Sequence, residues 1–207
     1  MSLAAQKRDS FPGSLTRTAD NSALYAALTT ARGVSDIGEP ADFSAESDYR
    51  LIRVDRQLES ISVNEFEIAL VNDVELSVIY YAKIELLQVP EVSSRDIAKH
   101  QVWRSACMCH TEALRDVSQR VLLGYIAQRY ELLLAEDAVF GDGKFYWHRQ
   151  VSLALELGFH VFSYDEVSRE LRPIPTQRAL SDLQDQAWSS TRPQTQRAII
   201  SIFPLPR

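Results

Sequence analysis

The residues best suited to bind a metal ion are Cys107, Cys109, His110 and His100. Thiolate sulfur and imidazole nitrogen are ligands that zinc prefers, but a structural zinc site needs four ligands and usually takes them from Cys-x2-Cys pairs. This chain offers one Cys-x-Cys-His run and no second pair. We therefore predict no metal site and interpret the cysteines as small buried thiols near the start of a helix.

Cys107 and Cys109 are the only two cysteines of the chain, and one residue separates them. A disulfide between such near neighbours would be strained and would close almost no loop. We therefore expect both thiols to be reduced, as in a cytoplasmic protein.

A second group with possible chemistry is acidic: Glu136, Asp137 and Asp142 follow a short apolar run. Paired carboxylates can bind a cation or act as general acid and base, and α/β folds often place ligand groups after a strand. Their spacing matches no EF-hand and no two-carboxylate enzyme. The favoured interpretation is a solvated loop that caps the following helix.

Four ring-bearing residues, Phe145, Tyr146, Trp147 and His148, occupy consecutive positions. Consecutive residues point in different directions around a helix, so at least one of these rings should be partly exposed. We predict that Phe145 and one neighbour anchor the core, with Tyr146 or Trp147 at its rim. A contact hot spot is the alternative, because aromatic rings dominate the energetics of many interfaces.

The sequence contains no recognisable catalytic arrangement. There is no Ser/His/Asp order, nucleophile elbow, P-loop or dinucleotide motif, and seven glycines leave few loops that could surround a phosphate. His160 alternates with Phe159 and Val161, which predicts a half-exposed strand residue rather than a general base. We therefore predict no catalytic, cofactor-binding or metal-binding residue.

The composition is that of an ordinary globular domain. The 207 residues are 45% hydrophobic and 24% charged, with a net charge of −6 and a pI near 5.3. An acidic chain without a basic stripe is poorly suited to bind nucleic acid or an anionic membrane. No apolar run is long enough to span a bilayer, and the N-terminus lacks the apolar core of a signal peptide. We expect a soluble cytoplasmic protein.

The first 47 residues are predicted to form an arm, a short helix and a loop. Residues 1–20 are rich in Ser, Thr, Pro, Gly and charge, which predicts a flexible arm. Asp20 and Asn21 are candidate N-caps of a helix that Gly33 ends. Residues 33–47 are predicted to be loop.

Residues 21–207 are predicted to form a single α/β domain with a C-terminal tail, residues 193–207. Alternation of apolar and polar residues predicts strands, and apolar residues at helical spacing predict helices. The predicted strands are 49–56, 66–71, 76–87, 132–135, 159–164, 170–174 and 198–203. The predicted helices are 94–102, 111–130 with Thr111 as N-cap, 144–157 closed by Gly158, and 178–188. This order predicts an α/β (α+β) fold with a central, mostly antiparallel mixed sheet flanked by helices.

The run Leu-Ala-Leu-Glu-Leu-Gly-Phe at residues 153–159 resembles the end of the late helix in the GCN5-related N-acetyltransferases. In that family an aromatic-Tyr pair precedes a Gly-Phe pair by a few residues. The order of predicted elements over residues 49–174 also resembles the family: antiparallel strands, a long helix, a central strand, a second helix and a final hairpin. The resemblance implies an acetyltransferase-like fold.

The family's chemistry does not carry over to these residues. The resemblance implies a glycine-containing loop that holds the pyrophosphate of acetyl-CoA at a helix N-terminus, and a tyrosine on the late helix that protonates the leaving thiolate. Residues 105–113 correspond to that loop but contain no glycine, and the charge of Glu112 would compete with a phosphate. Ala154 stands at the tyrosine position.

We therefore predict a non-catalytic structural or protein-binding module with a protein partner or self-association and no cofactor. The run at residues 143–147 resembles phage-encoded members of this fold, which suggests a tailed-bacteriophage virion or accessory protein. The alternative is an N-acetyltransferase that binds acetyl-CoA through an atypical loop. The apolar residues 198–203 are predicted to pair along an edge of the sheet or against another subunit.

Overall fold

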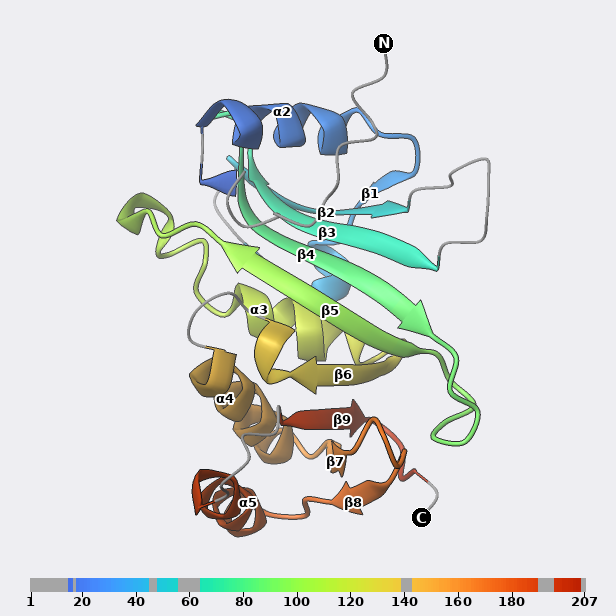
Figure 1. Ribbon diagram of the computed structural model, residues 1–207. Helices are drawn as coiled ribbons and strands as arrows, with labels where there is room; N and C mark the ends of the chain where they lie inside the picture. The colour runs from blue at the N-terminus through green and yellow to red at the C-terminus, as the bar shows by residue number, and fades with distance from the viewer. Residues whose placement is uncertain are drawn as a thin grey trace.

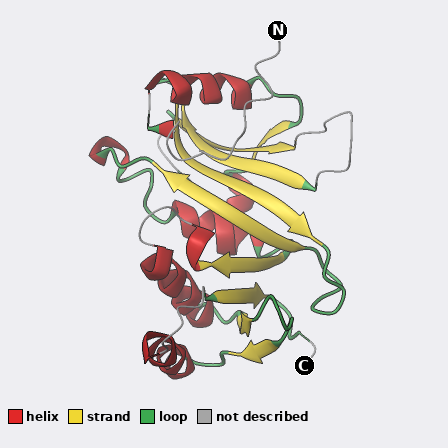
Figure 2. Ribbon diagram, viewed as in Figure 1, coloured by secondary structure: helices red, strands yellow, loops and turns green. Residues whose placement is uncertain are grey.

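A nine-stranded mixed sheet organises the chain, with helices on its faces (Figures 1 and 2). The computed structural model describes residues 15–16, 18–44, 48–55, 64–138, 143–189 and 196–205. The strand order is β1-β2-β3-β4-β5-β6-β9-β7-β8. This confirms the predicted α/β class and the predicted mixed, mostly antiparallel sheet.

The first half of the sheet is a run of antiparallel neighbours. Its strands are β1 (Val34–Asp36), β2 (Tyr49–Asp55), β3 (Glu65–Asn72), β4 (Ser77–Leu87) and β5 (Ile97–Arg104). The turn between β3 and β4 contains the predicted Asn72-Asp73 pair. The predictions for β2, β3 and β4 are confirmed, because β-branched and aromatic residues fill these strands.

The second half of the sheet contains the late strands. These are β6 (Glu131–Ala135), β7 (His160–Tyr164), β8 (Leu171–Pro173) and β9 (Arg197–Ser201). β9 lies between β6 and β7 and is antiparallel to both. The predicted pairing of the tail is therefore confirmed, but its predicted place at an edge is wrong: β9 is an interior strand.

Two helical layers enclose the sheet. Alternate residues of a strand face opposite sides, so Leu132 and Leu134 of β6 face the main core while Leu133 joins a separate cluster. Helix α2 (Thr18–Thr29) contacts β4 on one side of the sheet. On the other side lie α4 (Gly143–Glu156) and the π-helical segment Arg120–Ile126. Helix α5 (Gln177–Ser189) packs against α4. No helix of the described ranges is long and apolar enough to cross a membrane.

Asn21 lies inside α2 and does not cap it. Its buried side chain accepts a hydrogen bond from Val78 N (2.7 Å) and donates to Val78 O (2.9 Å) and Leu15 O (3.2 Å). The β4–β5 ladder begins only at Tyr80, so the Asn21 amide pairs with the end of β4 that β5 does not reach. The predicted N-cap role is wrong, because the amide serves a tertiary contact instead.

The arm predicted for residues 1–20 overlaps this helix. Leu15 is buried against α2 and the sheet, and residues 18–20 are the first turn of α2. Residues 1–14 and 17 lie outside the described residues.

Three other predictions fail for local reasons. Residues 97–104 form β5 and not a helix, because Ala98, His100 and Val102 alternate inward at a period of two. The predicted helix 111–130 is helical only from Val117, since Asp116 adopts a left-handed φ of 58° and residues 111–116 form turns. The predicted loop 33–47 contains β1 and a short 3-10 helix, Glu39–Ala41.

The late elements follow the sequence more closely. Helix α4 and helix α5 lie where the apolar spacing predicts them. Gly158 ends α4 with a φ of +81°, a conformation that favours glycine. The hairpin of β7 and β8 is antiparallel, as predicted.

The parallel pair β5 and β6 is joined over a short stretch only. The register covers Ile97–Lys99 of β5 and Glu131–Leu133 of β6, after which the two strands separate (Figure 1). β5 continues for five more residues to Arg104. Side chains from β4, β5 and α4 fill the interior beside this separation.

Candidate functional site

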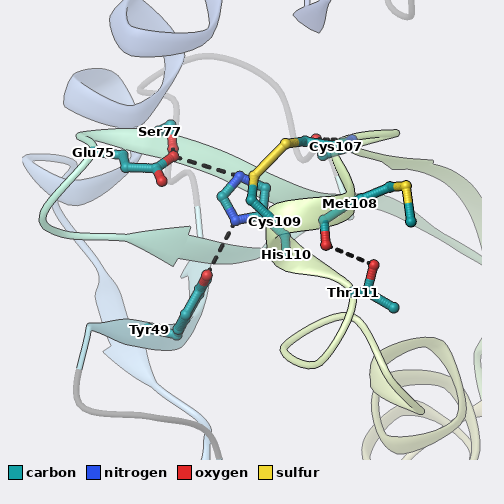
Figure 3. The surroundings of a disulfide bond; sticks show 9 residues. Tyr49, Glu75, Ser77, Cys107, Met108, Cys109, His110 and Thr111 are labelled. Atoms are coloured by element: carbon teal, nitrogen blue, oxygen red, sulfur yellow. Dashed lines mark hydrogen bonds and ion pairs between the residues drawn. A yellow bond between two sulfur atoms is a disulfide. The ribbon is translucent and has the colours of Figure 1, made fainter.

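The chain turns sharply after β5, and the two cysteines lie in this turn. Cys107 is extended (φ −67°, ψ 127°) and is followed by a single 3-10 turn, Met108–His110. This geometry places the Cα atoms of Cys107 and Cys109 5.3 Å apart, within the usual range for a disulfide, and their sulfurs are bonded (Figure 3). The prediction of reduced thiols is wrong in this structure. The prediction that they are buried is also wrong, because both residues are exposed.

His110 is the buried residue of this turn, and two distant residues hold its ring. Its Nδ1 lies 3.1 Å from the Tyr49 hydroxyl, and its Nε2 lies 3.4 Å from Glu75 Oε2. The Tyr49 and His110 rings meet edge-on, with centroids 6.1 Å apart. Figure 3 shows Glu75 and Tyr49 approaching the imidazole from different sides. Sequence reasoning missed both residues, because neither lies near the cysteines in the chain.

The β3–β4 turn fixes the position of Glu75. Asn72 Oδ1 accepts hydrogen bonds from the backbone N–H groups of Val74 and Glu75, each 2.9 Å long. Asp73 pairs with Arg50 and accepts a hydrogen bond from the Tyr25 hydroxyl (2.8 Å). These contacts lower the pKa of the Asp73 carboxyl, chiefly through the hydrogen bonds from Arg50. Contacts of Asn72 and Asp73 thus hold the turn just before Glu75.

Cys107, Cys109 and His110 form a compact group of possible metal ligands. One donor atom from each lies within 4.8 Å of the other two. His100, the fourth residue of the sequence cluster, is not part of this group. It is buried on β5, where its Nδ1 lies 3.0 Å from Leu133 O. The sequence cluster therefore divides into an exposed turn and a core histidine.

A second polar group lies inside the core, beside the separation of β5 and β6. It includes Tyr80, His100 and Tyr146. His100 Nε2 is buried without a hydrogen-bond partner among the described residues, and the two phenol oxygens are buried near the Ser118 side chain. Burial lowers the pKa of His100 to about 4. Burial also raises the pKa of the Tyr80 and Tyr146 phenols, and Ser118 partly offsets this effect. All three residues are therefore neutral at physiological pH, and atoms of this kind commonly bind ordered water.

The aromatic run of α4 is arranged differently from the prediction. Trp147 is the core residue, with 1% of its surface exposed, whereas Phe145 is 79% exposed. Tyr146 is half-buried and faces His100, with ring centroids 6.4 Å apart. The predicted roles of Phe145 and Trp147 are thus reversed, because the helix turns its Trp147 and Gln150 face toward the sheet.

The acidic residues after β6 do not converge in the described part of the chain. Glu136 Oε2 accepts a hydrogen bond from Gln196 N (3.1 Å) and so anchors the start of β9. Asp137 is exposed, and Asp142 lies outside the described residues. His160 is exposed at the start of β7, in agreement with its prediction as a strand residue.

The positions that the sequence resemblance assigns to coenzyme A lack the groups with which that family binds it. Residues 105–113 form a disulfide-bonded turn with no glycine, and Glu112 pairs there with Arg115 at 2.7 Å. Ala154 is fully buried and has no proton to donate. An open pocket of about 390 Å³ lies elsewhere, between the π-helical segment and Gly158, and the Arg120–Asp42 ion pair borders it.

Comparison of the chain with protein-family models, with curated proteins and with solved structures finds no match. The acetyltransferase-like resemblance therefore stays a prediction from the sequence.

Proposed function

We propose that this protein is a non-catalytic protein-binding or structural module on an acetyltransferase-like scaffold. The observation that carries the proposal is the turn after β5. Where the resemblance implies a loop that holds pyrophosphate, the chain has a disulfide-bonded turn, a buried histidine and an acidic residue. A phosphate would meet the Glu112 carboxylate and would find no glycine backbone to close around it.

Exposed apolar side chains support a role in protein binding. Val74 is 72% exposed, Leu76 is 53% exposed and Met108 is 88% exposed. They lie on the β3–β4 turn and on the Cys107–His110 turn, which the Glu75–His110 contact joins. Single exposed apolar residues are common, but several on adjoining braced turns are typical of contact surfaces.

The proposed partner is another protein with an apolar contact surface surrounded by Lys and Arg. The chain has a net charge of −6, so a basic partner gains from electrostatic attraction while a second copy is repelled. The proposed setting is a tailed-bacteriophage particle or accessory complex, and its support is the sequence resemblance at residues 143–147.

Calorimetric titration with acetyl-CoA tests the non-catalytic part of the proposal. We expect no heat of binding at micromolar to millimolar coenzyme, with the disulfide intact or reduced. Dissociation constants in the micromolar range would overturn it.

Paired variants test the binding surface. Met108→Asp and Val167→Asp each place a carboxylate at a highly exposed position, and Val167 lies on the β7–β8 turn. A partner from the native host is to be purified separately and titrated against both variants. We expect Met108→Asp to weaken binding at least about tenfold, as for loss of a contact residue worth more than 1.4 kcal/mol, and Val167→Asp to leave it unchanged. If the two variants bind the partner with equal affinity, the proposed contact surface around Met108 is wrong.

One observation favours the alternative, an N-acetyltransferase with an atypical coenzyme loop. β5 and β6 separate after three paired residues, and the buried hydroxyl of Tyr146 lies beside this separation. In that role the Tyr146 phenol, which burial keeps protonated, would donate its proton to the leaving thiolate. Under this alternative acetyl-CoA raises the melting temperature, and Tyr146→Phe abolishes transfer without abolishing that rise.

A further inference from the structure

We propose that, when the Cys107–Cys109 disulfide is reduced, Cys107, Cys109, His110 and Glu75 together bind one zinc ion. The donors are two thiolate sulfurs, His110 Nε2 and one carboxylate oxygen. This site is independent of the binding function proposed above, because it rests on donor geometry alone.

The imidazole and the carboxylate already have the separation that a shared zinc ion requires. His110 Nε2 and Glu75 Oε2 lie 3.4 Å apart. Two ligands at about 2.0–2.1 Å from zinc, at the tetrahedral angle, lie roughly 3.3–3.4 Å from each other. The Asn72 hydrogen bonds hold the backbone of Glu75, so the carboxylate is presented to the histidine before any metal arrives.

The two sulfurs lie close to His110. One donor atom from each of Cys107, Cys109 and His110 lies within 4.8 Å of the other two, and Glu75 joins this group through its 3.4 Å contact with His110 Nε2. Two sulfurs bound at about 2.3 Å to one zinc are roughly 3.8 Å apart, so the reduced pair has to separate by side-chain rotation. Both cysteines are exposed, and this rotation therefore displaces no core residue.

Tyr49 completes the site as a positioning residue. A histidine that binds zinc through one nitrogen usually donates the N–H of the other nitrogen to an oxygen, which fixes the ring and its tautomer. Here Nδ1 lies 3.1 Å from the Tyr49 hydroxyl, so in the zinc-bound form the Nδ1–H has an oxygen to donate to while Nε2 binds the metal. The burial of His110 holds the ring in this orientation.

The donor set selects the metal. Two thiolates and one imidazole are soft or borderline ligands, which favour zinc over calcium or magnesium. With two thiolates, one carboxylate and Zn²⁺ the net charge of the site is −1. Both cysteines are exposed, so solvent can screen this charge. Four protein ligands complete a tetrahedral structural site and leave no open position for catalysis.

The disulfide and the zinc ion exclude each other. Two equivalents of a thiol reductant convert the disulfide to two cysteine thiols and are themselves oxidised to one disulfide. Zinc binding then releases the two thiol protons to solvent. A two-electron oxidant reverses the sequence: the sulfurs bond and the ion leaves. The same turn is therefore crosslinked by a disulfide under oxidising conditions and by zinc under reducing conditions.

Metal titration of the full chain tests this site. The protein is reduced with a phosphine, freed of reductant without air, and titrated with zinc against a chromophoric chelator. We expect one zinc ion per reduced chain and none per oxidised chain. Cobalt(II) in place of zinc should show a thiolate-to-metal charge-transfer absorption of two sulfur ligands and the visible bands of a tetrahedral ion.

Three single variants assign the ligands. We expect Glu75→Gln and Tyr49→Phe each to weaken zinc binding about 10- to 100-fold, the usual effect of losing a weak ligand or an outer-shell partner. Glu112→Gln is the matched control: it removes a carboxylate three residues from Cys109 that pairs with Arg115 instead, and it should leave the affinity unchanged.

Any of three results would overturn the proposal. The first is a reduced chain that binds zinc no more tightly than the Cys107→Ser/Cys109→Ser double variant, whose melting curve shows that it is folded. The second is a Glu75→Gln affinity equal to that of the unmodified chain, and the third is a loss confined to Glu112→Gln.

Discussion

Replacing Ile200 by Ala should destabilise the protein strongly, because β9 is an interior strand. Ile200 is fully buried in the main core and lies opposite Leu132 of β6 and Val161 of β7. Loss of three carbons at about 0.8 kcal/mol each gives roughly 2.4 kcal/mol. The cavity left behind raises the total toward about 3.5 kcal/mol, within the usual range for this substitution.

Urea unfolding followed by circular dichroism measures this free energy. For a chain of this size about 3.5 kcal/mol corresponds to a fall in melting temperature of roughly 7–14 °C. Ile202→Ala is the matched control, since Ile202 follows β9 and is only half-buried; its loss should be less than half as large. Equal losses for the two variants, or a loss below about 1 kcal/mol for Ile200→Ala, would refute the interior position of β9.

Three further predictions concern single contacts. Asn21→Ala should cost about 2–4 kcal/mol in urea unfolding, because it leaves both outward backbone groups of one β4 residue buried without partners; a loss under 1 kcal/mol contradicts this. The depressed folded pKa of His100, about 4, means that stability is full above the unfolded pKa of about 6.5 and is lost as pH falls below it. The difference should be about 2 kcal/mol between pH 7.5 and 5, and His100→Gln should remove it. Gly33→Ala should lower the melting temperature more than Gly158→Ala. Both glycines have φ near +80°, but a Cβ at Gly33 would lie 2.7 Å from a carbonyl oxygen of β2, whereas a Cβ at Gly158 would have no atom within 4 Å. Equal falls in melting temperature would contradict this.

The sequence predicted the helices and strands in which the pattern of apolar residues continues without interruption. β2, β3, β4 and β6 have runs of apolar residues, and α4 and α5 have helical spacing. It failed at residues 97–104, where a lysine, a histidine and a glutamine hide the alternation of a strand. Local patterns could not reveal that His100 is buried, because its Nδ1 contacts the carbonyl of Leu133, which belongs to another strand.

The composition of the candidate site was hidden for a similar reason. The Cys-x-Cys-His run was visible, but the partners of His110 lie 61 residues away at Tyr49 and on the β3–β4 turn at Glu75. Such contacts depend on how the sheet folds back, and no spacing rule in one sequence predicts them. The prediction of no metal site considered cysteines and histidines only, and the fourth ligand proposed here, Glu75, lies on another turn.

The end of β5 and the turn that follows it are held by contacts with distant residues and by the disulfide. β5 ends at Arg104, which pairs with Tyr80, so the first residues of β4 have no partner in the β5 ladder, and the Asn21 amide pairs with the backbone groups of Val78. The segment after β5 is separated from the next helix by the turn residues 111–116, the last of which, Asp116, has a left-handed φ. Contacts outside the sheet therefore have to fix its position. The His110 contacts with Tyr49 and Glu75 supply that attachment, and a bond between the neighbouring cysteines, or a metal ion shared with Glu75, stiffens the turn that presents His110. A structural role, holding the turn that presents His110, therefore accounts for the Cys-x-Cys-His run.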